Sequence, residues 1–497
     1  MTIVSNDWTD TRRKSLVNLI ASSPAGAMFL RAEDCSGELK DSHFIVDVLI
    51  SAIEQVGPDK VVQVITDNAP VCKVAGLIIE SRYNHIFWTP CIVHNINLIL
   101  EEIEHKTAWV KEITGQAREI IKFITNHHLS QAIYREYSKL ELLKVAETRY
   151  ASNFIMLRRL VEVKNALMSM VVGPTWVEWR QADSERGSCV RRLLIDEDWW
   201  SKIDFLLKFT LPAFELLREA DTDRPFLGEV YDGMDSMVEK TVEIITQEAP
   251  TLLFVDADFA EQVRSIIVTR WNGFNTPLHT LAHALTPRFY DTDLIAQSNG
   301  KRKAPHQDKE VAIGVKKAFQ RLFLASLQTE VREEFACFAS GLEDFGDMSA
   351  LDERGSMNPL TWWTCRGANG VHLQSLATRI LSQVASSSAA ERNWSTYGFI
   401  HSVKRNRLGS QKAEDLVYVH SNLRLVSRRG EEYTNGPHKE WDVEAKNPDL
   451  DLSLAALDIT DGTSGASGSG IGSSTPRATV VGRASCSIFD DVDEEYM

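Results

Sequence analysis

Sequence patterns typical of β-strands are confined to about the first ninety residues of this 497-residue chain. Short runs rich in apolar and β-branched residues predict five strands, over Thr2–Trp8, Ser15–Ser22, Ala27–Ala32, Val61–Thr66 and His85–Thr89. From about residue 105 to 370 such runs nearly vanish, and apolar residues recur at the spacing of amphipathic helices. A stretch of that length is too long to be a loop. We therefore expect an α/β unit followed by a large helical domain.

The α/β unit combines three consecutive strands with two strand–helix pairs. Asp41 is suited to cap the first helix, and Gly57-Pro58 ends it. A second helix is predicted from about Cys72 to Ser81, with Val74, Leu77 and Ile78 on its apolar face. This order of elements is that of an RNase H-like fold, although it is also compatible with other mixed sheets.

Bulk composition excludes several classes of protein. A formal net charge of −15 argues against binding nucleic acid over the whole surface. Seven scattered cysteines form no disulfide framework, which fits a reducing compartment such as the nucleus or the cytosol. No run approaches the ~18 apolar residues that cross a bilayer, so no membrane partner is expected. The chain opens directly in strand-like sequence, which we interpret as the loss of a preceding segment.

Two acidic residues far apart in the sequence suggest a metal-dependent site. Asp67 follows the apolar run Val61–Thr66, and Glu391 lies among small residues in Ser386–Ser395. One carboxylate at the end of a strand and another on a late helix suit a divalent-metal centre for phosphoryl transfer. Each also has a simpler interpretation, Asp67 as the cap of the following helix and Glu391 as a surface residue of its own helix.

Six segments, taken together and in this order, resemble hAT-type transposases of the plant-like group. The segments are Asn6–Asp10, Val64–Ala69, Phe87–His94, Thr148–Ser152, Asn358–Trp363 and Ser386–Leu408. The last one is the most specific, and the likeness runs from residue 1 to about 425. The resemblance implies an RNase H-like core interrupted by a helical insertion, and a C-terminal segment that completes both the fold and a dimer interface. It also implies an active site of two aspartates and one glutamate that binds two Mg²⁺ or Mn²⁺ ions.

This chain departs from the family pattern at one of the implied metal ligands. The pattern makes Asp67 the second aspartate and Glu391 the glutamate, but it places Asn6 at the first position, with Asp7 one residue further on. Successive strand residues face opposite sides of a sheet, so Asp7 is expected to face away from the site. Divalent ions favour charged oxygen ligands, whereas an amide supplies one neutral oxygen. The site is therefore predicted to bind Mg²⁺ or Mn²⁺ weakly or not at all, unless a β-bulge turns Asp7 inward.

Other motifs bear on nucleic acid and zinc. The basic cluster of Lys404, Arg405 and Arg407 is interpreted with equal weight as a phosphate contact or nuclear-import signal and as a solvated turn. Cys91-x-x-His94 is half of a zinc motif, but no complementary pair is evident, so a helix start is favoured. The DNA-reading zinc finger that the family usually carries is expected to be missing, and nucleic-acid binding is expected to be weak.

The domain prediction divides the chain into four segments. Residues 1–104 form the first part of the core and residues 105–370 the helical insertion. Residues 371–426 complete the core and carry the dimerisation segment. Residues 427–497, rich in Gly, Ser and acidic residues, form a disordered tail.

The predicted function is a non-catalytic, transposase-derived protein that dimerises with itself or with related hAT-family proteins in the nucleus or the cytosol. The resemblance assigns Trp394, Leu416, Val419 and Leu423 to the dimer interface. The alternative is an active transposase fragment. In that case Asp67, Glu391 and a re-aimed Asp7 would hold two metal ions for hydrolysis and strand transfer.

Overall fold

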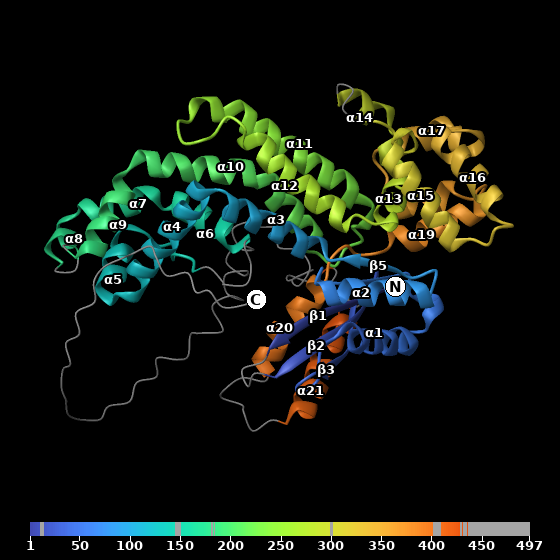
Figure 1. The fold of residues 1–497 in the computed structure, drawn as a ribbon, viewed down its shortest axis with the longest axis horizontal. Coiled ribbons are helices and arrows are strands. Elements are labelled where there is room, and N and C mark those ends of the chain that lie inside the picture. Colours follow the sequence, from blue (N-terminus) through green and yellow to red (C-terminus); the bar gives the residue numbers. More distant parts are fainter. Residues whose placement is uncertain are drawn as a thin grey trace.

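The computed structural model describes residues 1–9, 14–144, 151–179, 182, 184–298, 302–400, 409–427, 430 and 435. The basic cluster at residues 404–407 lies outside these ranges, and so does almost all of the predicted tail. Figure 1 shows a compact α/β unit beneath one end of an elongated row of helices.

A five-stranded mixed sheet forms the centre of the α/β unit. Its strands are β1 (Thr2–Thr9), β2 (Ser15–Ser23), β3 (Gly26–Asp34), β4 (Gln63–Thr66) and β5 (Phe87–Pro90). They lie in the order β3-β2-β1-β4-β5. The first three pair antiparallel, whereas β4 pairs in parallel with both β1 and β5. The five predicted strands and the mixed α/β class are confirmed.

Two helices cover one face of this sheet. In α1 (Ser42–Val56), the carboxylate of Asp41 accepts a hydrogen bond from the backbone of Phe44, as the predicted cap requires. The helix ends at Gly57, whose φ of 98° suits glycine. For α2 (Pro70–Arg82) the predicted buried face is wrong, since Val74 and Leu77 are 47% and 57% exposed. The buried face of α2 consists instead of Ala75, Gly76 and Ile79.

The missing side chain of Gly76 lets α2 pack closely against Trp88 on that face. A Cβ at this position would lie 2.2–2.7 Å from ring atoms of Trp88 on β5. Gly76→Ala is therefore expected to lower the free energy of unfolding by about 1–3 kcal/mol through overpacking. Gly115→Ala is the matched control, because no atom lies within 4 Å of its added Cβ. Since alanine favours a helix interior by about 1 kcal/mol, that variant should be neutral or more stable in urea denaturation.

Beyond β5 the described chain is helical. The α-helices are α3 (Ile92–Lys106), α4 (Ala108–Asn126), α5 (His128–Tyr137), α6 (Ala151–Glu162), α7 (Lys164–Val172), α8 (Pro174–Glu178), α9 (Glu185–Ile195), α10 (Glu197–Ala220), α11 (Val230–Glu248), α12 (Phe259–Phe274), α13 (Pro277–Ala284), α14 (Thr292–Gln297), α15 (Lys309–Leu322), α16 (Gln328–Ser340), α17 (Met348–Asp352), α18 (Pro359–Arg366), α19 (Val371–Leu381), α20 (Ser388–Ile400) and α21 (Ser410–Ser427). Short 3₁₀ turns are η1 (Pro58–Lys60), η2 (Leu227–Glu229), η3 (Ala249–Thr251), η4 (Pro287–Tyr290), η5 (Pro305–Gln307) and η6 (Glu343–Gly346).

Aromatic clusters hold these helices together. The ring centroid of Trp109 on α4 lies within 6.3 Å of the ring centroids of Phe205 and Phe209 on α10. It lies 5.9 Å from the ring centroid of Phe259 on α12. Such ring pairs stabilise a core beyond the area that they bury. The clusters therefore fix how α4, α10 and α12 cross.

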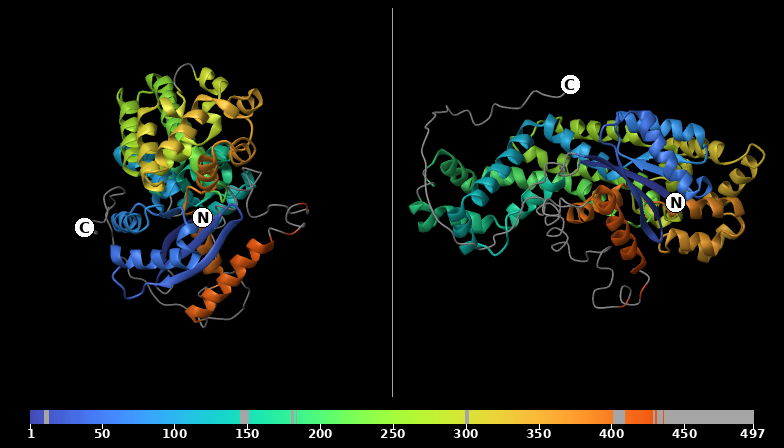
Figure 2. Two further views of the ribbon diagram at one scale, coloured as in Figure 1. Left: turned by 90° about the vertical axis from the view of Figure 1, so that its right-hand side faces the viewer. Right: turned by 90° about the horizontal axis from the view of Figure 1, so that it is seen from below.

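The chain returns to the sheet at its C-terminal end. Figure 2 shows α20 and α21, in orange, lying against the blue strands. A buried polar cluster ties this return to the start of the chain: Thr2 Oγ1 lies 3.0 Å from Gln63 Oε1 and 2.8 Å from Gln383 Oε1, and its one proton can be donated to either. A buried polar group without a partner costs free energy, so this cluster favours one position of residue 383 against β1 and β4.

Side chains from distant helices cover the backbone at both edges of the sheet. On β3, Asn422 of α21 accepts from the backbone N–H of Phe29 and donates to its carbonyl, each at 3.0 Å. Beside β5, Arg321 of α15 donates to the carbonyl of Ile86 at 2.8 Å and stacks over the ring of Phe87. Covered edges do not pair with other strands, so these contacts protect the sheet from aggregation.

Candidate active site

Asn6 and Asp67 lie at the same end of two neighbouring interior strands, β1 and β4. The parallel pairing of β1 and β4 ends at Val4 and Ile65, and Asn6 and Asp67 are each two residues further on. Val4 and Ile65 face the larger core cluster, which contains residues of α3 and α20. Because strand side chains alternate, Asn6 points to that same face. Asp67 Oδ1 accepts a hydrogen bond from the backbone of Ala69 at 3.1 Å, ahead of α2, which has no side-chain cap of its own.

Glu391 lies in the first turn of α20, and contacts of Cys91 place that turn near the end of β4. Cys91 marks the junction, because its backbone N–H donates to the carbonyl of Thr66 at 2.8 Å and its Sγ accepts from the backbone of Ser387 at 3.2 Å. Burial raises the pKa of the Cys91 thiol to about 11, and the Glu391 charge contributes to the shift. Glu391 therefore lies near the end of β4, which Asp67 follows directly.

The amide of Asn6 is engaged by a tryptophan of α20. Trp394 Nε1 donates to Asn6 Oδ1 at 2.9 Å, and its ring stacks on Trp8 with centroids 5.0 Å apart. Trp394 is only 7% exposed, so its indole is buried within the chain and adds almost nothing to the outer surface. The contact occupies one of the two acceptor positions of the Asn6 oxygen.

Asp7 lies on the opposite face of β1. Its carboxylate accepts from Lys40 Nζ at 2.7 Å, just ahead of α1. The β-bulge of the sheet falls between β2 and β3, at Leu19/Ile20, and the pairing of β1 with β2 is regular. The backbone therefore does not turn Asp7 toward Asp67.

Three polar residues that the sequence analysis did not identify position α20. Asn18 of β2, which is fully buried, donates from Nδ2 to the carbonyl of Ala390 at 2.9 Å. Its neighbour Asn393 accepts from Ser421 Oγ at 2.7 Å, which links α20 to α21. The sequence did carry a signal for Asn18, because it stands in the middle of an apolar strand. A buried amide needs hydrogen-bond partners, so such a residue is expected to contact another part of the chain.

These residues do not fit a centre for two divalent cations. The carboxylates of Asp67 and Glu391 are present, but the third ligand position carries the neutral amide of Asn6. Two neighbouring cations repel each other, and negatively charged ligands are needed to offset that repulsion. Asp7, the nearest carboxylate in sequence, is paired with Lys40 on the other face.

The remaining predicted residues lie in different places. Leu416, Val419 and Leu423 are 48%, 50% and 62% exposed on the outer side of α21. Cys91 is buried against Ser387, so the sulfur of the half zinc motif faces the core. In the described part of the chain, metal-type side chains cluster at Glu330, Glu334 and His372. There Glu334 accepts from the backbone of Leu373 at the start of α19, which is a capping role.

Two family models and one curated protein match this chain. Residues 1–120 match a domain described as a domain of unknown function (DUF659), and residues 342–423 match the hAT family C-terminal dimerisation region. The human zinc finger BED domain-containing protein 4 is 24% identical over 391 residues, which cover 73% of this chain. The chain spans 31% of the length of that relative. Together these matches confirm the resemblance to hAT-family transposases.

Of the helices in the described ranges, none combines the length and the apolar character that spanning a bilayer requires.

Proposed function

We propose that this chain is an hAT transposase-derived protein that acts through dimerisation rather than catalysis. The observation that carries the proposal is an exposed apolar row on α21, within the segment that matches the dimerisation region or just beyond it. The row consists of Leu416, Val419, Leu423 and Val426, each 48–62% exposed. Their spacing of three, four and three residues lines one side of a helix. Such a seam suits packing against the same helix of a second copy or of a related hAT-family protein.

The proposed architecture follows the predicted segments. We take the sheet with α1 and α2 as an RNase H-like core, the helices after residue 105 as its insertion, and residues 371–426 as the segment that completes the core. The strand order and the return of α20 onto β1 and β2 support this arrangement. The tail after residue 427 would take no part in the folded core.

The absence of catalysis is proposed from one ligand position. The contacts of Cys91 with Thr66 and Ser387 bring the end of β4 and the start of α20 together, so Asp67 and Glu391 would remain as two of the three implied acids. The missing charge at Asn6, and the Trp394 hydrogen bond to its oxygen, favour a site that does not hold two metal ions. An active transposase fragment is the second candidate, and it depends on the two retained acids.

A nuclear location, and contact with DNA through a partner, are proposed from the one related protein. The related human protein is named for a BED zinc finger. Because zinc fingers of this kind read DNA, we infer a nuclear location for this chain and its partner. A partner that carries such a finger would bring DNA recognition to a heterodimer, whereas this chain would supply the dimerisation surface.

Sedimentation equilibrium tests the dimer. The wild-type chain should be dimeric at micromolar concentration, and Val419→Asp/Leu423→Asp should raise the dimer Kd at least about 100-fold, because burying two unpaired charges at a seam costs several kcal/mol. Leu77→Asp is the matched control, since Leu77 is a similarly exposed apolar residue on α2. A wild-type monomer, or a dimer that Leu77→Asp weakens equally, contradicts the proposal.

A further inference from the structure

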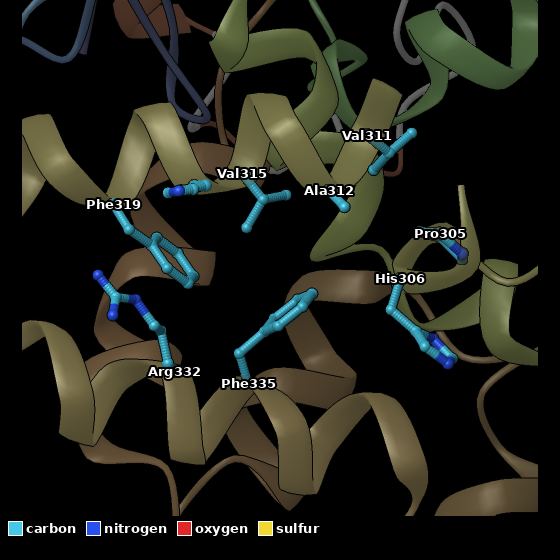
Figure 3. Close-up of a pocket in the computed structure, with 9 residues that line it drawn as sticks. Pro305, His306, Val311, Ala312, Val315, Phe319, Arg332 and Phe335 are labelled. Carbon is cyan, nitrogen blue, oxygen red and sulfur yellow. The ribbon is translucent and has the colours of Figure 1, made fainter. Parts of the chain in front are cut away.

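An apolar cavity opens between α15 and α16, away from the sheet and from α21. Its volume is about 320 Å³, near the lower end of the roughly 300–1,000 Å³ typical of ligand pockets. Phe319 and Phe335 line the cavity as an edge-to-face pair, with ring centroids 5.8 Å apart and planes at 84°, and Figure 3 shows Val315 on the same wall as Phe319. This pair forms an apolar wall against which an aromatic or branched apolar side chain can pack.

Two cations border this cavity. Lys316 of α15 and Arg332 of α16 both contribute to its lining. Arg332 donates to the neutral side chain of Gln328 at 2.9 Å, and within the described residues neither cation forms an ion pair. On the α15 side the sequence is basic, with seven Lys or Arg against two acidic residues between positions 301 and 321, although Arg302 and Arg321 are ion-paired and α16 carries Glu330, Glu333 and Glu334. The cavity therefore favours an apolar side chain that is followed by carboxylates.

This chain contains one such segment near its end. Residues 488–495 read Ile-Phe-Asp-Asp-Val-Asp-Glu-Glu, with five carboxylates directly after Phe489 and no basic residue. We propose that this segment docks in the cavity of its own chain. Phe489 packs against the edge-to-face pair of Phe319 and Phe335, and the carboxylates that follow pair with Lys316 and Arg332.

The chain between the folded part and this segment is long enough. About 60 residues separate Ser427 from Phe489. Fully extended they span about 200 Å, compared with a radius of gyration of about 22 Å for a compact fold of this size. Tethering at that length gives an effective concentration on the order of millimolar, so even a weak contact would be substantially occupied.

Photo-cross-linking in the full-length protein tests the proposal. With Phe489→p-benzoylphenylalanine, irradiation should yield covalent adducts to peptides of α15 and α16 that migrate as the monomer. Lys316→Glu/Arg332→Glu should reduce these adducts at least fivefold. Asp490→Lys/Asp491→Lys in that background should restore them, which distinguishes lost charge pairing from misfolding.

Two controls complete the experiment. Lys317→Glu adds the same negative charge to an exposed neighbour that does not line the cavity, and it should leave the adducts unchanged. Leu454→p-benzoylphenylalanine probes a second apolar and acidic stretch of the tail, and it should give few adducts on these helices. Adducts elsewhere, adducts between two chains, adducts insensitive to the charge reversal, or stronger adducts from position 454 each overturn the proposal.

Discussion

Mn²⁺ should bind the Asn6→Asp variant about 100-fold more tightly than the wild-type chain, as measured by titration calorimetry at neutral pH. The substitution restores a carboxylate beside Asp67 and Glu391 while keeping an oxygen that accepts from Trp394. A full charge placed close to a cation is worth up to roughly 4 kcal/mol near a protein surface. We expect about 2–3 kcal/mol of that to be realised, and each ~1.4 kcal/mol corresponds to a tenfold change in Kd.

Two further variants show whether the gained affinity belongs to this site. Asn6→Asp/Asp67→Ala should lose the binding, because it removes the neighbouring ligand. Asn6→Asp/Asp7→Asn should retain it within about twofold, since Asp7 pairs with Lys40 on the other face of β1. Wild-type binding as tight as that of Asn6→Asp would instead favour the active transposase fragment, and nuclease assays would then be the next step.

Acidification should destabilise the helical region through two buried histidines of α13. Burial lowers the pKa of His279 to about 4 and that of His283 to about 3. Nδ1 of His279 accepts from the backbone N–H of Thr276 at 3.1 Å, so this nitrogen carries no proton. His283 packs against the rings of Tyr231 and Phe289, and its Nδ1 has no hydrogen-bond partner among the described residues.

The sign of the effect follows from proton binding. Both histidines have a pKa below about 6.5, the usual value in the unfolded chain. The unfolded state therefore binds more protons, and the stabilisation present above pH 6.5 is lost as the pH falls toward 4 and 3. Each histidine should lower the free energy of unfolding by about 2 kcal/mol between pH 6.5 and 4.5.

His283→Phe isolates one of these contributions. The variant keeps an aromatic ring between Tyr231 and Phe289 but does not titrate. Urea denaturation at several pH values should show that about 2 kcal/mol of the acid-induced loss is absent from the variant. Burial raises the pKa of nearby Asp235 to about 7 and acts in the opposite direction, but its contribution is common to both proteins and cancels in the difference. Parallel pH profiles would contradict the assignment.

Features set by neighbouring residues were predictable from the sequence. The strands, the Asp41 cap and the Gly57 stop all depend on patterns within a few positions, and the structure confirms them. The face of α2 was not predictable in this way, because Gly76 contributes no hydrophobicity to a pattern. It is buried because Trp88, which is twelve residues later, needs the space of a missing side chain.

The candidate site was predictable only in part for the same reason. Strand alternation placed Asp7 away from Asn6, since that rule is local. The contacts of Asn18 with Ala390 and of Thr2 with Gln383 join residues more than 370 positions apart. No periodicity in a single sequence encodes such partners. Trp394 illustrates the limit of a family assignment, because its position in the dimerisation segment gave no sign that it stacks on Trp8.

The late return of α20 and α21 to the sheet has a consequence for synthesis on the ribosome. The last residue of β3 is Asp34, but the helix that covers the edge of that strand begins at Ser410. At roughly 5–20 residues per second, the edge is translated about 20–75 seconds before its cover. During that interval the nascent strands can pair with those of a neighbouring nascent chain. We therefore expect the folding yield in cells to depend on a chaperone that holds the first ninety residues until translation is complete.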